Sequence, residues 1–288
     1  MPLYENRYWW SNDGLRLHYR DYAGGADGRP PILCLPGLTR NARDFDGIAS
    51  RLAGDWRVIA VDFRGRGDSA FSKDPMTYAP LTYVQDVEAL LTELKVDRFI
   101  AFGTSLGGIV TMLLAGTARE KLVGALLNDI GPEIDPSGLS RIRSYVGKGS
   151  ACPTWMHAAR AVAEANGDAY PGYAIEDWLA MAKRLYRLNS AGRIVLDYDM
   201  KIAEPFRVPG NEAGPDMWRA LASLRDVPTL IVRGERSDVL QARTADRMVA
   251  ELNDVELATV PGVGHTPMLT EAVLEDPVDR LLSRALAA

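Results

Sequence analysis

Ser105 has neighbours that could make an ordinary hydroxyl into a nucleophile. It lies in segment 103–108, GTSLGG, between the apolar segment 99–102 and a second apolar stretch long enough for three helical turns. This order predicts a strand, a sharp turn and a helix with the serine at the apex, which is the pattern of a nucleophile elbow. The glycines allow the strained backbone that such a turn requires.

Glycine-rich turns between a strand and a helix also bind phosphates, so two alternatives need comparison with the sequence. A Walker A loop requires Lys-Ser or Lys-Thr after its glycines, and segment 103–108 has neither. A dinucleotide-binding loop requires a third glycine and an acid at the end of the next strand. A nucleophile requires instead that the rest of the chain supply a base and an acid.

The candidate base is His265, because a serine hydroxyl is a poor nucleophile near neutral pH until a base removes its proton. His265 ends the loop 261–265, PGVGH, which follows the last predicted strand, 255–260. The glycines of this loop allow it to come close to the end of the sheet. We therefore expect the imidazole to reach the hydroxyl of Ser105.

The imidazole in turn needs a carboxylate that fixes its tautomer and stabilises its charged form. Two acids, Asp238 and Asp129, lie in loops that follow apolar segments. The order Ser105, Asp238, His265 is the one that this type of elbow uses. The loop of Asp238 also neighbours the loop of His265 if the last two strands pair. We therefore expect Asp238 to be the acid, and Asp129 to hydrogen-bond loop amides at the entrance of the cap.

Attack on a carbonyl also requires two N–H groups aimed at the oxygen on which charge develops. Leu106 supplies one, because its amide opens the helix after the serine, where negative charge is stabilised. The second is expected from Leu38, in the turn after the apolar segment 31–35, where Gly37 allows the backbone to come close. Leu38 and Leu106 are thus the expected oxyanion hole.

The elements that must position these residues alternate along the chain. Segment 7–22 carries Asn-Asp-Gly at its middle, which predicts a β-hairpin with a tight turn. Short, wholly apolar segments then alternate with helical patterns, which is typical of a parallel sheet covered on both faces. Besides the helix after Ser105, the expected strands are 31–35, 58–61, 99–102, 122–127, 228–233 and 255–260, and the expected helices are 42–52, 81–94, 241–252 and 273–286.

The alternation stops between residues 131 and 226, where helical patterns occupy 154–164 and 175–188. An all-helical insertion between two strands of one sheet is typical of a lid or cap. We therefore expect an α/β core of residues 1–130 and 227–288 and a helical cap of residues 131–226.

Three tryptophans, Trp155, Trp178 and Trp218, lie in this insertion. Trp155 follows Cys-Pro at the start of a helix, where a large side chain can lean over a cavity, so it is the expected substrate-binding residue. Trp178 lies on an apolar stripe and is expected to pack between the cap and the sheet.

Composition limits the classes of protein that need be considered. Hydrophobic residues make up 47% of the 288 residues and charged residues 25%, which is ordinary for a globular protein. The formal net charge is −5 with no basic run, which argues against a nucleic-acid partner. No apolar segment approaches membrane-spanning length and the N-terminus lacks a secretion pattern, so we expect a cytoplasmic protein. Basic and acidic residues are equal in number within 131–226, which argues against a cap that gathers strongly charged substrates.

Taken together, these residues resemble the α/β-hydrolase fold family. The resemblance runs from the hairpin to the C-terminal helix and rests on PG at 36–37, DxRGxGxS over 62–69, GTSLGG at 103–108, Asp238 and Gly264-His265. It implies an eight-stranded, mostly parallel sheet with helices on both faces, a helical cap after the sixth strand, and cleavage of an ester, lactone or related bond without a cofactor. The family usually has His-Gly before the oxyanion amide, where this chain has Pro36-Gly37; the backbone amide itself is retained.

We therefore expect a serine hydrolase that cleaves an ester or lactone bond of a small, largely apolar substrate through an acyl-enzyme on Ser105, His265 and Asp238. A serine nucleophile argues against dehalogenase or epoxide hydrolase chemistry, for which the family uses aspartate. Two alternatives stay open: a C–C bond hydrolase of a diketone-type substrate on the same triad, and a ligand-binding receptor on the same fold.

No cofactor or metal is expected, and the expected partner is a small-molecule substrate, not nucleic acid or a membrane. The oligomeric state is left open.

Overall fold

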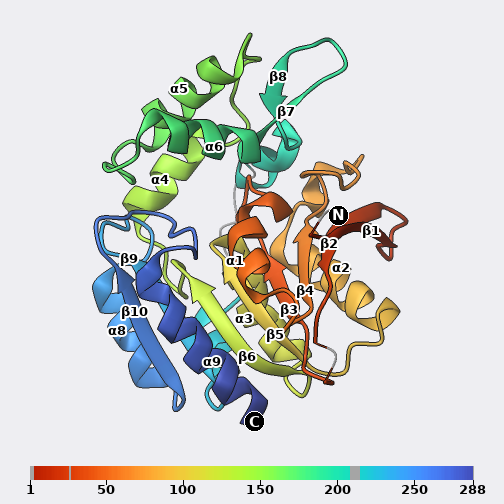
Figure 1. The fold of residues 1–288 in the computed structure, drawn as a ribbon, viewed down its shortest axis with the longest axis vertical. Coiled ribbons are helices and arrows are strands. Elements are labelled where there is room, and N and C mark those ends of the chain that lie inside the picture. Colours follow the sequence, from red (N-terminus) through yellow and green to blue (C-terminus); the bar gives the residue numbers. More distant parts are fainter. Residues whose placement is uncertain (1–2, 26, 208–214, 288) are drawn as a thin grey trace.

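The computed structural model describes residues 3–25, 27–207 and 215–287. An eight-stranded sheet has the order β1-β2-β4-β3-β5-β6-β9-β10 (Figure 1). β2 runs antiparallel to both of its neighbours, and the remaining pairs are parallel. The strands are β1 (Glu5–Trp10), β2 (Arg16–Tyr22), β3 (Ile32–Leu35), β4 (Val58–Asp62), β5 (Phe99–Thr104), β6 (Leu122–Asn128), β9 (Thr229–Gly234) and β10 (Val255–Val260). The expected hairpin and the expected mostly parallel sheet are both confirmed.

Helices cover both faces of this sheet, so its central strands β3 to β6 are almost wholly buried, which explains why their sequences are apolar without alternation. Helices α2, α3, α7 and α8 pack on one face, and α1 and α9 pack on the other (Figure 1). The helices of the two faces are α1 (Asp46–Leu52), α2 (Pro80–Glu93), α3 (Leu106–Thr117), α7 (Met217–Ala222), α8 (Ala242–Glu251) and α9 (Glu275–Ala287). Short 3₁₀ helices are η1 (Ala42–Phe45), η2 (Pro75–Thr77), η3 (Met200–Arg207) and η4 (Ala272–Leu274).

The chain between β6 and β9 builds a separate layer over the ends of the strands, seen at the top of Figure 1. We call residues 131–226 the cap segment. It contains α4 (Pro136–Tyr145), α5 (Trp155–Asn166) and α6 (Ile175–Leu185), and a small hairpin of β7 (Tyr186–Leu188) and β8 (Ile194–Leu196). α5 and α6 share a hydrophobic cluster of their own, distinct from the two clusters that flank the sheet.

Two features of the cap segment differ from the expectation. The expected helix 175–188 ends at Leu185, because residues 186–188 pair with β8 in a hairpin whose turn Asn189 closes by accepting from the amides of Ala191 and Arg193. The insertion is therefore not all helical. α7 also lies within 131–226, but its Leu221 is buried in a core cluster against the sheet. The part of the insertion that covers the strand ends is therefore shorter than the whole of residues 131–226.

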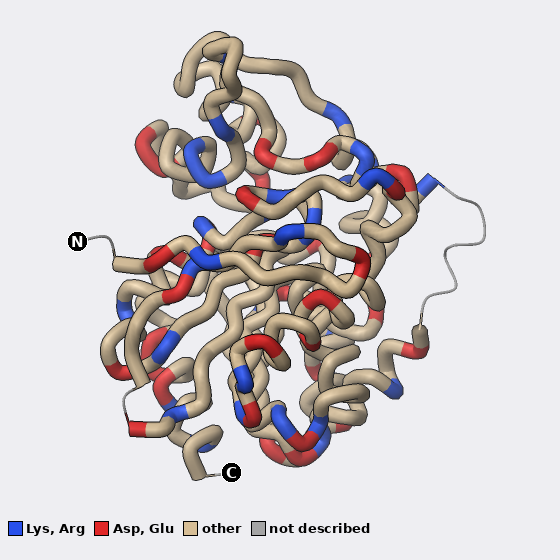
Figure 2. Tube along the Cα trace, turned by 90° about the vertical axis from the view of Figure 1, so that its right-hand side faces the viewer, with Lys and Arg blue, Asp and Glu red and all other residues tan. Residues whose placement is uncertain are grey.

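Basic and acidic residues are interspersed over the described chain (Figure 2). In the described part of the chain, no helix combines the length and the apolar character that crossing a membrane requires.

Candidate active site

Ser105 lies at the sharp turn between β5 and α3, as expected. Its backbone has φ 50° and ψ −113°, a conformation that non-glycine residues rarely adopt. The glycines beside it are required by close packing: a Cβ on Gly107 would lie 1.9 Å from the carbonyl oxygen of Leu35, and one on Gly103 would lie 2.4 Å from that of Gly107. The tight contacts between strand and helix therefore hold the serine in its strained position.

His265 connects Ser105 to a buried carboxylate. Its Nε2 lies 2.9 Å from Ser105 Oγ, and its Nδ1 lies 2.8 Å from Oδ2 of Asp129. The Asp129 residue is fully buried, and its carboxylate accepts from two more donors, the amide of Gly234 and the hydroxyl of Ser237. A hydroxyl hydrogen-bonded to an imidazole, whose other nitrogen contacts a buried carboxylate, can lose its proton to that imidazole during attack on a carbonyl.

The structure contradicts the expected partnership of Asp238 with His265. Asp238 forms a two-pronged ion pair with Arg141 of α4, with Nη2 donating to Oδ1 at 2.8 Å and Nε donating to Oδ2 at 2.5 Å. Asp129 takes its place because it directly follows β6, which lies between the elbow strand β5 and β9. Asp238 is four residues beyond the end of β9, and its neighbour Ser237 is the residue that reaches the carboxylate of Asp129.

Leu38 and Leu106, whose amides were expected to form the oxyanion hole, both belong to segments close to Ser105. Leu106 is the first residue of α3, and Leu38 lines the same cavity as Ser105. Among the described residues, no acceptor takes up the N–H of either leucine. The carbonyl of Leu38 accepts from Nε of Arg66, a fully buried arginine, at 2.8 Å. Arg66 therefore helps to hold the loop of Leu38 in its conformation.

Two side chains that the sequence did not point to hold the elbow and the histidine loop together. Asn128, the last residue of β6, donates to Oγ1 of Thr104 and to the carbonyl of Pro267, and its own carbonyl accepts from the amide of Ser105. Tyr170 of the cap segment donates its hydroxyl to the carbonyl of Thr266 at 2.6 Å and accepts from the Thr266 amide at 3.0 Å. Thr266 and Pro267 directly follow His265 in the chain, so both Asn128 and Tyr170 help to position it.

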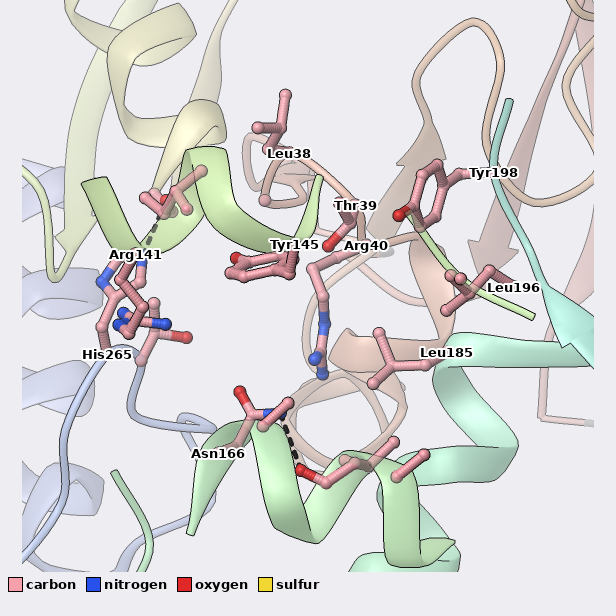
Figure 3. Close-up of a pocket in the computed structure, with 18 of the residues that line it drawn as sticks. Leu38, Thr39, Arg40, Arg141, Tyr145, Asn166, Leu185, Leu196, Tyr198 and His265 are labelled. Carbon is pink, nitrogen blue, oxygen red and sulfur yellow. Dashed lines mark hydrogen bonds between the residues drawn. The ribbon is translucent and has the colours of Figure 1, made fainter. Parts of the chain in front are cut away.

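A cavity of about 200 Å³ opens above Ser105 and His265, between the core and the cap segment. Figure 3 shows side chains from the Leu38 loop, from α4 and from α5 converging on it. Its apolar and aromatic walls come mainly from Ile142, Tyr145, Val162, Tyr170, Leu185, Leu196 and Tyr198.

Trp155 is not among the residues that line this cavity, which differs from the expectation that it lies against the substrate. It packs half-buried against the hydrophobic cluster of the cap, because the start of α5 lies away from the cavity and later residues of the helix, Val162 and Asn166, face it. Trp178 is buried in that same cluster, edge-on to Tyr170 at 6.1 Å between ring centres. It therefore packs inside the cap rather than between cap and sheet.

One group of possible metal ligands occurs within the described residues, formed by His18, Asp62 and Asp68. Asp62 already accepts from His18 Nδ1 at 2.7 Å and from the amides of Ala42 and Asp68. His18 also contacts Asn6 through Nε2. His18 and Asp62 are thus engaged with each other and with their neighbours, and they tie the turn after β4 to the hairpin.

Comparison with known proteins agrees with this architecture. A family model described as "Alpha/beta hydrolase family" matches residues 32–283. The chain is 35% identical over 263 residues to a 3-hydroxybutyrate-oligomer hydrolase of Cupriavidus necator, covering 89% of each chain. It is 26% identical over 253 residues to a 2-(acetamidomethylene)succinate hydrolase of Mesorhizobium japonicum, covering 87% of this chain and 85% of the relative. A crystal structure described as an alpha/beta hydrolase from Novosphingobium aromaticivorans is 56% identical and superposes with a TM-score of 0.94, covering 99% of each chain.

Proposed function

Because this chain belongs to the alpha/beta hydrolase family, we propose that it is a serine hydrolase that cleaves a carboxylic ester bond of a small substrate through an acyl-enzyme. The observation that carries the proposal is the hydrogen-bonded series Ser105, His265, Asp129 at the floor of a cavity. A relative is named for the hydrolysis of 3-hydroxybutyrate oligomers, in which hydroxy-acid units are joined by ester bonds, and this supports an ester over other bonds.

The reaction would begin with attack of Ser105 Oγ on the ester carbonyl while His265 Nε2 takes the hydroxyl proton. The amides of Leu38 and Leu106 would stabilise the oxygen that becomes negative, and the buried carboxylate of Asp129 would stabilise the imidazolium. His265 then returns the proton to the leaving alcohol oxygen. Water then attacks the acyl group on Ser105 while His265 takes a proton from the water. His265 returns this proton to Ser105 Oγ, which releases the acid and restores the serine.

The test is turnover of 4-nitrophenyl butyrate by the wild type, Ser105→Ala and the control Ser283→Ala. Ser283 is an exposed residue of α9, away from the cavity. We expect Ser105→Ala to lower turnover by roughly 10⁴-fold or more and Ser283→Ala to leave it unchanged. Retention of a tenth of wild-type activity by pure Ser105→Ala would exclude Ser105 as the nucleophile. A wild type that binds the ester without releasing nitrophenol would indicate the receptor alternative, and turnover confined to a diketone would indicate C–C bond cleavage.

A further inference from the structure

The charged side chains around the cavity are all of one sign. Arg40, Arg141 and Lys148 line it, and no Asp or Glu side chain is among the described residues of its wall. This differs from the cap segment as a whole, in which basic and acidic residues are equal in number. The cavity therefore presents a positive face that the overall composition conceals.

Arg40 lines the same cavity as Ser105. A Cβ built on Gly37 would lie 3.1 Å from Cγ of Arg40 and 3.7 Å from Cβ of Ser105, so the arginine side chain starts beside the nucleophile. Figure 3 shows its guanidinium pointing into the cavity that it shares with Tyr145 and Asn166. About a fifth of the side chain is exposed there.

The charge of Arg40 is only partly balanced. Its Nε and Nη2 donate to the carboxylate of Asp44, while Nη1 has no acceptor among the described residues. Arg184 shares the same carboxylate, with Nε 3.4 Å from Asp44 Oδ1. Two guanidinium groups on one carboxylate give this cluster of three side chains a net charge of +1. A hydrogen-bond donor of the cluster faces the cavity.

The other two cations differ in their partners. Arg141 is neutralised by Asp238, so it adds hydrogen-bond donors but little net charge. Lys148, in the loop after α4, is exposed, and its ammonium has no acid partner within the described part of the chain. It therefore extends the positive face to the mouth of the cavity.

No other described residue of the cavity wall supplies a negative charge. Burial raises the pKa of Tyr145 and raises that of Tyr198 to about 12, so both phenols stay neutral near pH 7. The remaining lining residues are apolar, or polar and neutral such as Thr39 and Asn166. A bound anion would meet donors and cations on a low-polarity background, in which charge-assisted hydrogen bonds are strong.

We propose that the ester substrate carries a carboxylate, and that Arg40 binds this carboxylate inside the cavity while Lys148 attracts it at the mouth. The proposal rests on the ester hydrolysis proposed above and narrows its substrate to anionic esters of short acids. Because Arg40 and Ser105 line one cavity of only about 200 Å³, the carboxylate would lie a few bonds from the scissile carbonyl, as it does in esters of short hydroxy acids or diacids.

The test compares two pairs of esters that differ in charge but hardly in size. Methyl hydrogen glutarate carries the carboxylate on the acyl side, with methyl 4-carbamoylbutanoate as its neutral partner. The anion 3-acetoxybutanoate carries it on the alcohol side, with 3-acetoxybutanamide as its neutral partner. Acid release gives kcat/KM for the wild type, Arg40→Gln, Arg40→Lys, Lys148→Gln and the control Lys183→Gln. Lys183 is an exposed residue of α6 outside the cavity wall.

In at least one pair, we expect the wild type to prefer the anion by about 10- to 100-fold, the range of a hydrogen bond to a charged group. Arg40→Gln should remove most of that ratio, Arg40→Lys should retain part of it, and Lys148→Gln should lower it by about two- to fivefold. The ratio for Lys183→Gln should equal that of the wild type. Equal kcat/KM within both pairs, or a preference that survives Arg40→Gln, would overturn the proposal.

Binding separates this proposal from the ester hydrolysis on which it rests. Calorimetry with Ser105→Ala and 3-acetoxybutanoate requires no turnover, and the amide serves as its neutral partner. Tighter binding of the anion, lost when Arg40→Gln is added, supports the carboxylate site even if no ester is cleaved. Equal binding of anion and amide, together with Ser105-dependent cleavage of 4-nitrophenyl butyrate, would reject the carboxylate site alone.

Discussion

Ser237 Oγ lies 2.6 Å from Asp129 Oδ2, the same carboxylate oxygen that His265 Nδ1 contacts. The hydroxyl belongs to the loop in which the acid was expected, one residue before Asp238. The loop after β9 therefore helps to hold the carboxylate of Asp129 in place beside His265.

The first prediction concerns the identity of the acid. Asp129→Asn should lower kcat for a neutral ester by roughly 10³–10⁴-fold, because the amide favours the wrong tautomer of His265. Asp238→Asn should cost less than about tenfold, because it breaks the ion pair with Arg141 but leaves the contacts among Ser105, His265 and Asp129 intact. The measurement is kcat for 4-nitrophenyl butyrate at constant pH, with circular dichroism as the folding control. A larger loss in Asp238→Asn than in Asp129→Asn would return the acid to the loop after β9.

A second prediction concerns Tyr170, which contacts both polar groups of the Thr266 backbone. Tyr170→Phe should lower kcat by about tenfold with little change in KM, because small displacements of a catalytic group are costly. Tyr173→Phe is the matched control, since its ring stacks on Tyr170 at 4.7 Å and its hydroxyl makes no contact with Thr266. Equal effects of the two substitutions would show that Tyr170 contributes packing alone.

The third prediction compares Trp155 with a residue of the cavity wall. Leu185→Ala should change the ratio of kcat/KM for short and long acyl esters by about tenfold, which is typical of a pocket contact. Trp155→Ala should leave this ratio unchanged and lower the melting temperature by several degrees, because it removes buried surface from the cap cluster. A changed ratio in Trp155→Ala at an unchanged melting temperature would restore its role in substrate binding.

The fourth prediction is a pH dependence of the ion pair that joins α4 to the core. Burial acts to raise the pKa of Asp238, but the Arg141 guanidinium outweighs it and holds the pKa below its ordinary value of about 3.8. The stability from this pair is therefore present above about pH 3.8 and is lost as the pH falls through the lowered pKa. Urea unfolding should show Asp238→Asn less stable than the wild type near neutral pH, with the difference shrinking in acid. A difference that is constant with pH would contradict this assignment.

The sheet could be predicted from sequence because its central strands are buried on both faces. Continuous apolar segments such as Ile32–Leu35 and Phe99–Thr104 are recognisable without knowledge of their partners. The elbow was recognisable for a related reason, because close contact between strand and helix admits only glycine at Gly107. In both cases the physical requirement acts on neighbouring residues.

The acid could not be chosen in this way, because the choice depends on three loops that meet only in the folded chain. Asp129 and Asp238 both follow strands, and local pattern does not say which carboxylate turns toward His265. One signal was present: Asp129 directly follows a strand that had to lie near the elbow. The residues that line the cavity could not be predicted either, since Arg40 and Lys148 are far apart in sequence. The sequence predicted the helix α5 but not which of its faces turns toward the cavity.

The contacts of Ala169 and Tyr170 with the histidine loop limit how this architecture can diversify. The carbonyl of Ala169 accepts from the amide of Gly264 at 2.6 Å, beside the Tyr170 contacts with Thr266. A cap segment transplanted from a relative would thus bring its own contacts to the histidine loop along with its own part of the cavity wall. We expect recombination between members of the family to yield active chimeras mainly where the donor segment keeps these two contacts. One segment would then carry both the support of the histidine loop and part of the cavity wall.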